Sequence, residues 1–144
     1  MSNFFTEQES EDLVNAIVEL EKSTVGELRV HFEDLCPDAP MDRAVELFNK
    51  LEMYRTDHKT GILIYVAADD HKLAIIGDKG IHAVLGDQYW LDIMNEMKSK
   101  FAHESIYSGV LFGVLAVGEK LKEHFPETRK SENELSNEIS YGKI

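Results

Sequence analysis

The stretch Gly61–Gly80, GILIYVAADDHKLAIIGDKG, decides the fold because it holds two apolar runs separated by a short polar loop. The first run, GILIYVAA, is apolar on both faces, which is typical of a strand buried inside a sheet. The second run, KLAII, begins after only three residues, Asp69 to His71, a loop of hairpin length. The sequence therefore predicts two antiparallel strands, the first of them central.

Upstream of this hairpin the sequence predicts a helix, a strand and a second helix. Thr6 and Glu9 match a capping box, and apolar residues recur at helical spacing from about Glu7 to Lys22. ELRVHFE, Glu27–Glu33, alternates apolar and polar residues, which predicts a strand that is wet on one face and lies at an edge. We expect Asp42 to cap the next helix, which then crosses over to a parallel strand.

Two further helices and a polar tail follow the hairpin. An apolar stripe that includes Trp90 predicts a third helix with Asp87 as its N-cap, and a fourth helix has its apolar face from Ile106 onward. We expect one domain over residues 1–126 and a polar tail over 127–144, packed on or beside the domain. The order of elements predicts an α/β fold, a three-layer α/β/α sandwich with a small mixed sheet.

The composition favours cations and basic partners. Lys and Arg number 15 against 27 Asp and Glu, and the net charge of −12 is the wrong sign for a phosphate backbone or an anionic lipid surface. The longest clean apolar run is far shorter than the ~20 residues of a membrane helix, and the N-terminus lacks the pattern of a secretory signal. A single cysteine, Cys36, agrees with a reducing compartment. We expect a cytoplasmic monomer that neither binds nucleic acid nor inserts into a membrane.

Two Gly-Asp turns, at Asp78 and Asp87, offer the oxygen ligands that a hard cation takes. Calcium binds six to eight oxygens, from carboxylates and from backbone carbonyls of loops. If the hairpin forms, Asp78 leaves the sheet at the end where Glu27 enters it, and Asp87 begins the next helix nearby. The tail offers Glu132, Asn133 and Glu134. We therefore expect one or two divalent cations, calcium or else magnesium or a similar ion, to tie loop and tail together.

The same residues also have purely structural interpretations. Asp78 fits an Asx-turn, Asp87 fits a helix cap, and Glu27 fits a solvated strand position. A docking module without metal is a further alternative, in which aromatic residues such as Tyr89 and Trp90 anchor an unidentified protein partner. At helical spacing, however, such residues more often belong to the core.

No motif in the sequence is a catalytic signature. Six residues separate Cys36 from Arg43, where a cysteine phosphatase loop has five, and the chain contains neither an EF-hand loop nor a zinc-binding spacing of histidines. A metal-dependent phosphatase stays open, because a bound cation can polarise a phosphoryl oxygen and orient water. The sequence offers no nucleophile for it, so an enzyme ranks second to a cation-binding domain.

Three segments, GELRVHFED, GILIYVAADDHKLAIIGDKGIH and YSGVLFGVLAVGEKLKEHFP, resemble the TPM domain in their order and spacing. This family is seen in a thylakoid lumen protein, a photosystem II repair factor and an acetylcholine-receptor modulator. The resemblance extends from about Thr6 to Pro126. It implies an α/β/α sandwich with an acidic crevice, binding of divalent cations and of calcium in particular, acid phosphatase activity in some members, and roles in maintaining or assembling membrane complexes.

The chain departs from the pattern of many of these relatives. They carry a signal peptide, a membrane helix and often a glycine-rich tail, whereas this sequence shows none of the three, and its segment NELSNEISYG resembles a tail of cytoplasmic relatives. The sequence therefore predicts a stand-alone TPM-like domain whose bound cation is structural or regulatory and modulates a partner.

Overall fold

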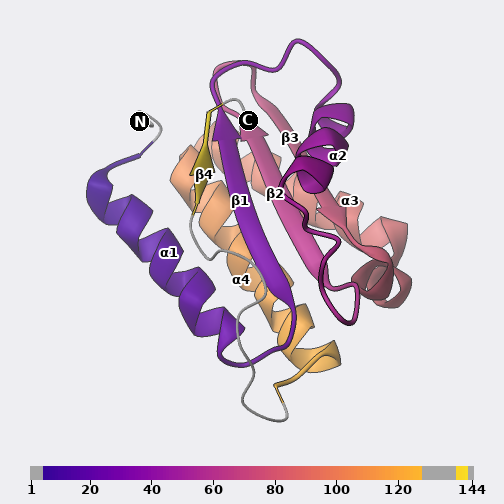
Figure 1. The fold of residues 1–144 in the computed structure, drawn as a ribbon. Coiled ribbons are helices and arrows are strands. Elements are labelled where there is room, and N and C mark those ends of the chain that lie inside the picture. The colour runs from indigo at the N-terminus through magenta and orange to yellow at the C-terminus, as the bar shows by residue number, and fades with distance from the viewer. Residues whose placement is uncertain (1–4, 128–138, 143–144) are drawn as a thin grey trace.

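The computed structural model describes residues 5–127 and 139–142. Within those ranges the chain forms four helices and four strands (Figure 1). In chain order they are α1 (Glu7–Glu21), β1 (Glu27–Glu33), α2 (Pro40–Lys50), β2 (Gly61–Ala67), β3 (Lys72–Gly77), α3 (Lys79–His103), α4 (Ile106–His124) and β4 (Ser140–Tyr141).

The strands form one mixed sheet in the order β3-β2-β1-β4. β1 and β2 are parallel, with Glu27 opposite Gly61, and α2 is the crossover between them. β2 and β3 are antiparallel, with Ile62 opposite Gly77, so the predicted hairpin is confirmed. β2 is buried along its whole length, as its two-sided apolar pattern predicts.

Helices cover both faces of the sheet, which confirms the predicted three-layer sandwich (Figure 1). On one face α1, α3 and α4 pack over side chains such as Val30, Phe32 and Ile64 in the larger core. On the other face α2 packs alone, with Leu47 and Phe48 over Leu63 and related side chains. None of the helices in the described part of the chain combines the length and apolarity needed to cross a bilayer.

β1 is not an edge strand, contrary to the prediction. β4 pairs in parallel with its outer side at His31 and Phe32, so β1 lies between β2 and β4. Three of the four polar residues of β1, Glu27, His31 and Glu33, are buried, and Arg29 is partly buried. Their partners come from distant parts of the chain, whereas a polar residue in an alternating pattern ordinarily indicates contact with water.

Within the predicted tail, Ser140 and Tyr141 form a strand of the sheet. Ile139 and Ser140 are buried, and Ser140 Oγ lies 2.6 Å from Arg29 Nε. Tyr141 stacks on Phe32 with ring centroids 5.8 Å apart. The polar composition of the tail hides this strand, since two strand residues are too few to produce a pattern.

The helix starts agree only in part with the sequence. The Thr6–Glu9 capping box of α1 is present. α2 begins at Pro40 and Asp42 lies inside its first turn, because proline supplies a fixed φ and lacks the N–H that a cap would satisfy. α3 begins at Lys79 with Asp78 as its cap, and not at Asp87.

Two helical segments meet at Gly86 inside α3. The φ of +81° and ψ of 167° at Gly86 are not helical, so the segment that the sequence predicts from Asp87 follows this kink, and the segment from Lys79 to Leu85 precedes it. Glycine adopts such a φ without the strain that other residues would carry.

Candidate metal centre

Glu27 and Asp78 lie at the same end of the sheet, where β1 and β2 begin and β3 ends. Glu27 is opposite Gly61, and the Asp78 N–H donates to the Gly61 carbonyl at 2.9 Å. The two acidic residues are therefore two strand spacings apart, roughly 10 Å between their Cα atoms. Above Gly61, the Met53 carbonyl oxygen lies 2.6 Å from the position that a Cβ would take. Gly61 thus separates the two carboxylates.

Asp78 already has a structural role at this end. Its Oδ1 accepts a hydrogen bond from the Lys79 N–H at 2.8 Å and caps α3. Its Oδ2 is buried and has no hydrogen-bond partner in the part of the chain that the structure describes. Asp78 therefore combines a helix cap with one oxygen that is open to a further donor or cation.

Asp87 lies on the surface of α3. Its side chain is 89 % exposed, and its Oδ1 is 3.0 Å from Nε2 of His82. Across the described residues, no group of three or more His, Cys, Asp and Glu side chains is arranged to hold a metal ion. The structure therefore does not bring Glu27, Asp78 and Asp87 into one site.

The remaining predicted ligands, Glu132, Asn133 and Glu134, lie outside the described residues. Two backbone hydrogen bonds fix the position at which the tail begins. The Glu127 N–H donates to the Ser23 carbonyl at 3.1 Å, and the Val25 N–H donates to the Phe125 carbonyl at 3.0 Å. The tail thus leaves α4 beside the loop that joins α1 to β1.

That loop brings a second carboxyl group, Glu21, onto Glu27. Glu21 is the last residue of α1, and its Oε2 accepts a hydrogen bond from the Leu28 N–H at 2.9 Å. This N–H points away from β2, and β4 pairs with β1 only farther along, at His31 and Phe32. Glu21 therefore accepts the hydrogen bond of a backbone N–H at the outer edge of β1, and its carboxyl group lies close to that of Glu27.

The two carboxyl groups share a buried environment. Glu21 is 7 % exposed and Glu27 is 4 % exposed. Burial, and then the hydrogen bond and negative charge of Glu27, raise the pKa of Glu21 to about 9. Because burial and the neighbouring Glu27 both disfavour the ionised form of Glu21, this pair of carboxyl groups holds one proton at neutral pH.

Replacing Glu21 by glutamine is expected to flatten the pH dependence of stability. In the unfolded chain this carboxyl ionises near its ordinary pKa of 4.5, while the folded pair keeps its proton to about pH 9. The contribution of this carboxyl group to the free energy of unfolding is therefore greatest below pH 4.5. It falls by up to ~1.4 kcal/mol per pH unit as the pH rises from about 4.5 to about 9. The glutamine side chain of the variant stays neutral, so urea denaturation across the window should show a shallower decline.

Glu11→Gln is the matched control for this measurement, because Glu11 lies on the same helix and is exposed. It should leave the slope of unfolding free energy against pH at its wild-type value. An equal slope in Glu21→Gln and wild type would contradict the shared proton.

Glu21 was missed by the sequence analysis, although a signal for it exists. The buried stripe of α1 runs through Leu13, Ile17 and Leu20, and Glu21 stands four residues after Ile17 on the same side. A carboxylate at a stripe position near a helix end indicates a buried, partnered group.

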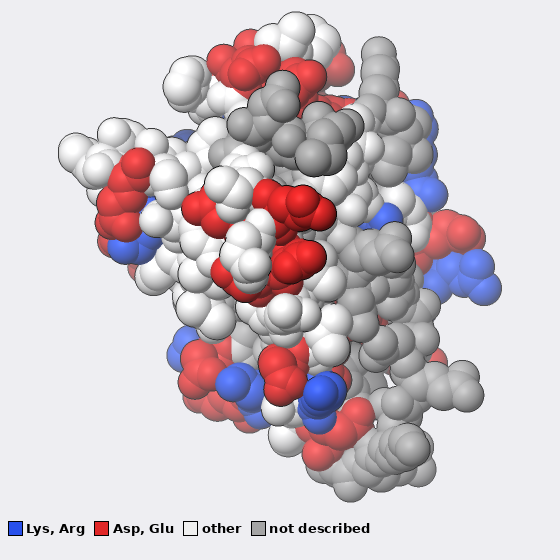
Figure 2. All heavy atoms as spheres, turned by 90° about the vertical axis from the view of Figure 1, so that its left-hand side faces the viewer, with Lys and Arg blue, Asp and Glu red and all other residues white. Residues whose placement is uncertain are grey.

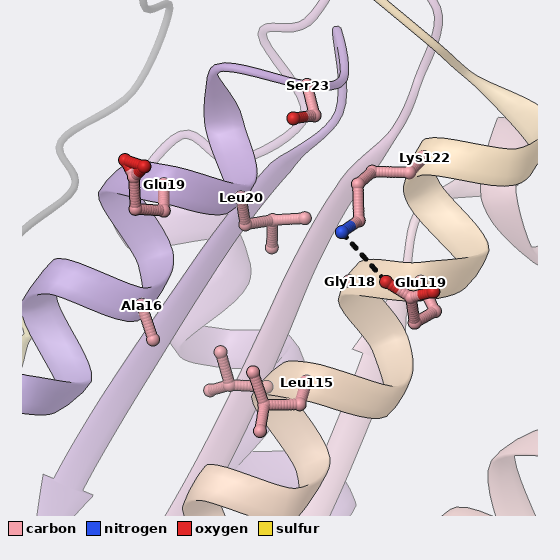
Figure 3. A pocket seen from close by; sticks show the side chains of 9 residues that line it. Ala16, Glu19, Leu20, Ser23, Leu115, Gly118, Glu119 and Lys122 are labelled. Atoms are coloured by element: carbon pink, nitrogen blue, oxygen red, sulfur yellow. Dashed lines mark ion pairs between the residues drawn. The ribbon is translucent and has the colours of Figure 1, made fainter.

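A groove between α1 and α4 lies close to the end of α1, and Figure 3 shows its lining. It has a volume of about 370 Å³, and Ala16 and Leu20 of α1 face Leu115 and Gly118 of α4. The charged side chains at its rim are exposed, and Glu119 pairs with Lys122 at 2.8 Å. The polar groups of this groove are thus solvated rather than held for a ligand.

The face that carries α1 is predominantly acidic. Figure 2 shows Asp and Glu gathered at its centre and the basic side chains toward its lower part and rim. The exposed acidic residues of α1 are Glu7, Glu11, Asp12 and Glu19. This field raises the local concentration of cations.

A second buried polar cluster lies at the opposite end of β1. Arg43 of α2 donates from Nε to Glu33 Oε1 at 3.0 Å and from Nη2 to Glu33 Oε2, and the Tyr65 hydroxyl donates to Glu33 Oε1 at 2.6 Å. Burial works to raise the pKa of Glu33, but the hydrogen bonds from Arg43 and Tyr65 outweigh it and hold that pKa below its usual value. This carboxylate is ionised and fully paired, which is a structural role.

Comparisons with known proteins agree with this architecture. The NMR structure of the BA42 protein from the psychrophilic bacterium Bizionia argentinensis is 37 % identical, with a TM-score of 0.89 over 99 % of this chain and 98 % of that one. The N-terminal domain of a P. gingivalis protein (17 % identity, TM-score 0.72, 90 % of this chain and 84 % of that chain) shares the fold. So does the N-terminal domain of a Corynebacterium glutamicum protein (11 % identity, TM-score 0.66, 92 % and 84 %).

The family comparison covers most of the chain. No curated protein matches the sequence. The model of the TPM domain matches residues 1–120. With this match and the 37 % identity to BA42 over nearly the whole length of both proteins, the chain belongs to the TPM domain family.

Proposed function

We propose that this TPM domain binds a divalent cation, calcium in the first instance, at the Glu21–Glu27 pair, and that the cation takes the place of the shared proton. The observation that carries the proposal is that two buried carboxyl groups lie close together, since Glu21 accepts a hydrogen bond from the amide of Leu28, the residue after Glu27. Such a pair must be neutralised, either by a proton or by a cation. Carboxylate oxygens are the ligands that calcium prefers.

The further ligands of the cation are proposed from where their segments lie in the fold. Two carboxylates supply at most four of the six to eight oxygens that calcium takes. The tail leaves α4 beside Ser23, only a few residues from Glu21, so Glu132, Asn133 and Glu134 are the proposed further ligands. Asp78 lies beyond Gly61 and is the proposed ligand of a second cation at the same end. Asp87 is left out because its side chain is 89 % exposed on the surface of α3.

A cation in this position would be structural or regulatory. It would join the end of α1 and the start of β1 to the tail, in which Ser140 and Tyr141 form β4. Binding to the folded state alone stabilises that state, by ~2.7 kcal/mol at a hundredfold excess over the dissociation constant. Acid phosphatase activity stays a prediction from family resemblance, and we propose no catalytic residue.

Calcium titration of chelator-treated protein is expected to shift the amide resonances of Glu27 and Leu28 in NMR spectra. Because the cation displaces a proton, calorimetry in buffers of different ionisation enthalpy should show proton release on binding at neutral pH. Magnesium, titrated separately, tests the preference for the ion.

Matched variants locate the site. Glu27→Gln should abolish the shifts at Leu28, Glu11→Gln should leave them unchanged, and Glu132→Gln with Glu134→Gln should weaken binding if the tail supplies ligands. The proposal is wrong if calcium at several millimolar moves no resonance near β1, or if it binds without releasing a proton.

A further inference from the structure

The outer edge of β3 lies outside the proposed Glu21–Glu27 cation site and carries backbone groups that no strand of the described chain pairs with. β3 ends the strand order, and no strand of the described chain pairs with its far side. In an antiparallel ladder, hydrogen-bonded pairs of opposed residues alternate with pairs that are not hydrogen-bonded. The Asp78 N–H donates to the Gly61 carbonyl, so Asp78 and Gly61 are a hydrogen-bonded pair of the β2–β3 ladder. By that alternation the N–H and C=O groups of Leu73, Ile75 and Gly77 point away from β2. These groups can bind one more strand.

An apolar groove of about 630 Å³ runs along this edge between α2 and α3. Ile75 and Gly77 form the strand side, Trp90 and Leu91 belong to α3, and Met41 comes from α2. Met41 is 42 % exposed and Leu91 is 49 % exposed, so apolar surface is open to a partner. Trp90, by contrast, is only 7 % exposed and forms part of the wall.

The edge lacks the usual protection against strand addition. Proteins ordinarily blunt an exposed edge with charged residues, proline or a bulge. β3, KLAIIG, has a single charge at its first residue, Lys72, and it contains no proline. Its outer edge therefore resembles the edges that other domains use to bind extended peptides.

Charge at the rim of the groove indicates the kind of partner. The Asp87 carboxylate is 89 % exposed, and it faces His82, whose Nδ1 accepts a hydrogen bond from the Trp90 indole at 3.1 Å. The chain carries a net charge of −12, which opposes pairing with a second copy and attracts a basic segment.

We propose that the outer edge of β3 binds a basic, extended peptide segment of a partner protein by strand addition. The peptide backbone bonds to Ile75 and Gly77, alternate apolar side chains enter the groove against Trp90 and Leu91, and a Lys or Arg side chain pairs with Asp87. This interaction requires no cation, so its test is independent of the calcium site and is made with chelator present.

The first test uses a capped peptide in which Val and Lys alternate. Trp90 is the only tryptophan of the chain, so its fluorescence reports occupancy of the groove. The peptide should change this fluorescence and slow hydrogen exchange of the Ile75 and Gly77 amides. A peptide with Glu for Lys, and one with a central Pro, should each bind at least tenfold more weakly, because the first repels Asp87 and the second loses a backbone donor.

Charge-reversal variants complete the test. Asp87→Lys should weaken binding roughly fivefold at low salt, while Asp92→Lys, an exposed position on the same helix with the same change in net charge, should have no effect. Equal binding of the Pro-containing peptide would overturn strand addition. If sedimentation shows a dimer without peptide, and the Ile75 and Gly77 amides are protected from hydrogen exchange in that dimer, the partner is a second copy of the chain and not a basic peptide. If no peptide binds at millimolar concentration, strand addition by a basic peptide is wrong.

Discussion

Replacing Arg43 by methionine is expected to destabilise the fold by about 3–5 kcal/mol. The Arg43 and Glu33 side chains are only 7 % and 8 % exposed, and Arg43 is the cation that neutralises this carboxylate. Methionine preserves much of the packing of the arginine stem but leaves the charge of Glu33 buried and unpaired. Urea denaturation at neutral pH should therefore show a lower midpoint with an unchanged slope.

A double variant separates the charge from the packing. Glu33→Gln added to Arg43→Met removes the unpaired charge while keeping an acceptor for the Tyr65 hydroxyl, so it should recover most of the lost stability. Arg55→Met removes an exposed pair with Glu52, at 66 % and 53 % exposure, and should cost no more than about 1 kcal/mol. If the double variant were no more stable than Arg43→Met, lost packing rather than the buried charge would explain the effect.

Gly80→Ala is expected to destabilise the fold by more than about 3 kcal/mol, at the upper limit of overpacking effects. A Cβ at Gly80 would fall on the backbone carbonyl of His58 and lie 2.7 Å from that of Lys59. Neither carbonyl can move freely, because Lys59 accepts hydrogen bonds from the Gly80 and Ile81 amides that hold the loop against the start of α3. Thermal or urea unfolding measures the loss.

Gly118→Ala is the matched control, since it makes the same change in a helix. There the added Cβ meets only the end of the Leu20 side chain, at 2.9 Å, which can rotate, and alanine favours the helix by ~1 kcal/mol over glycine. We expect stability within about 1 kcal/mol of wild type. Similar losses for both substitutions would show that the loop at His58 is not what constrains Gly80.

The candidate site was only partly accessible to sequence reasoning. The hairpin alone places Asp78 and Glu27 at one end of the sheet, and the structure confirms this. Gly61 lies between them because of the register in which β1 pairs with β2. This register cannot be predicted from the local sequence of either strand. Glu21 reaches Glu27 only because α1 ends beside the outer edge of β1.

The sequence by itself determined the four helices, the first three strands and the layers that they form. Each of these depends on local periodicity, on capping residues such as Thr6, and on the rule that a strand, a helix and a strand cross over in parallel. Such signals are contained within one element or its immediate neighbours, so they survive without knowledge of the rest of the chain.

Only the tertiary structure decided which polar groups are buried, that β1 lies inside the sheet and where an edge stays open. Glu27, His31 and Glu33 are polar in a pattern typical of a wet face, but α2, α1 and β4 exclude water from them. The paired Glu21 and Glu27 and the unpaired edge of β3 both arise from contacts between distant segments. The free energy of a polar group depends on what surrounds it, and the surroundings of these residues are set by segments tens of residues away in the chain.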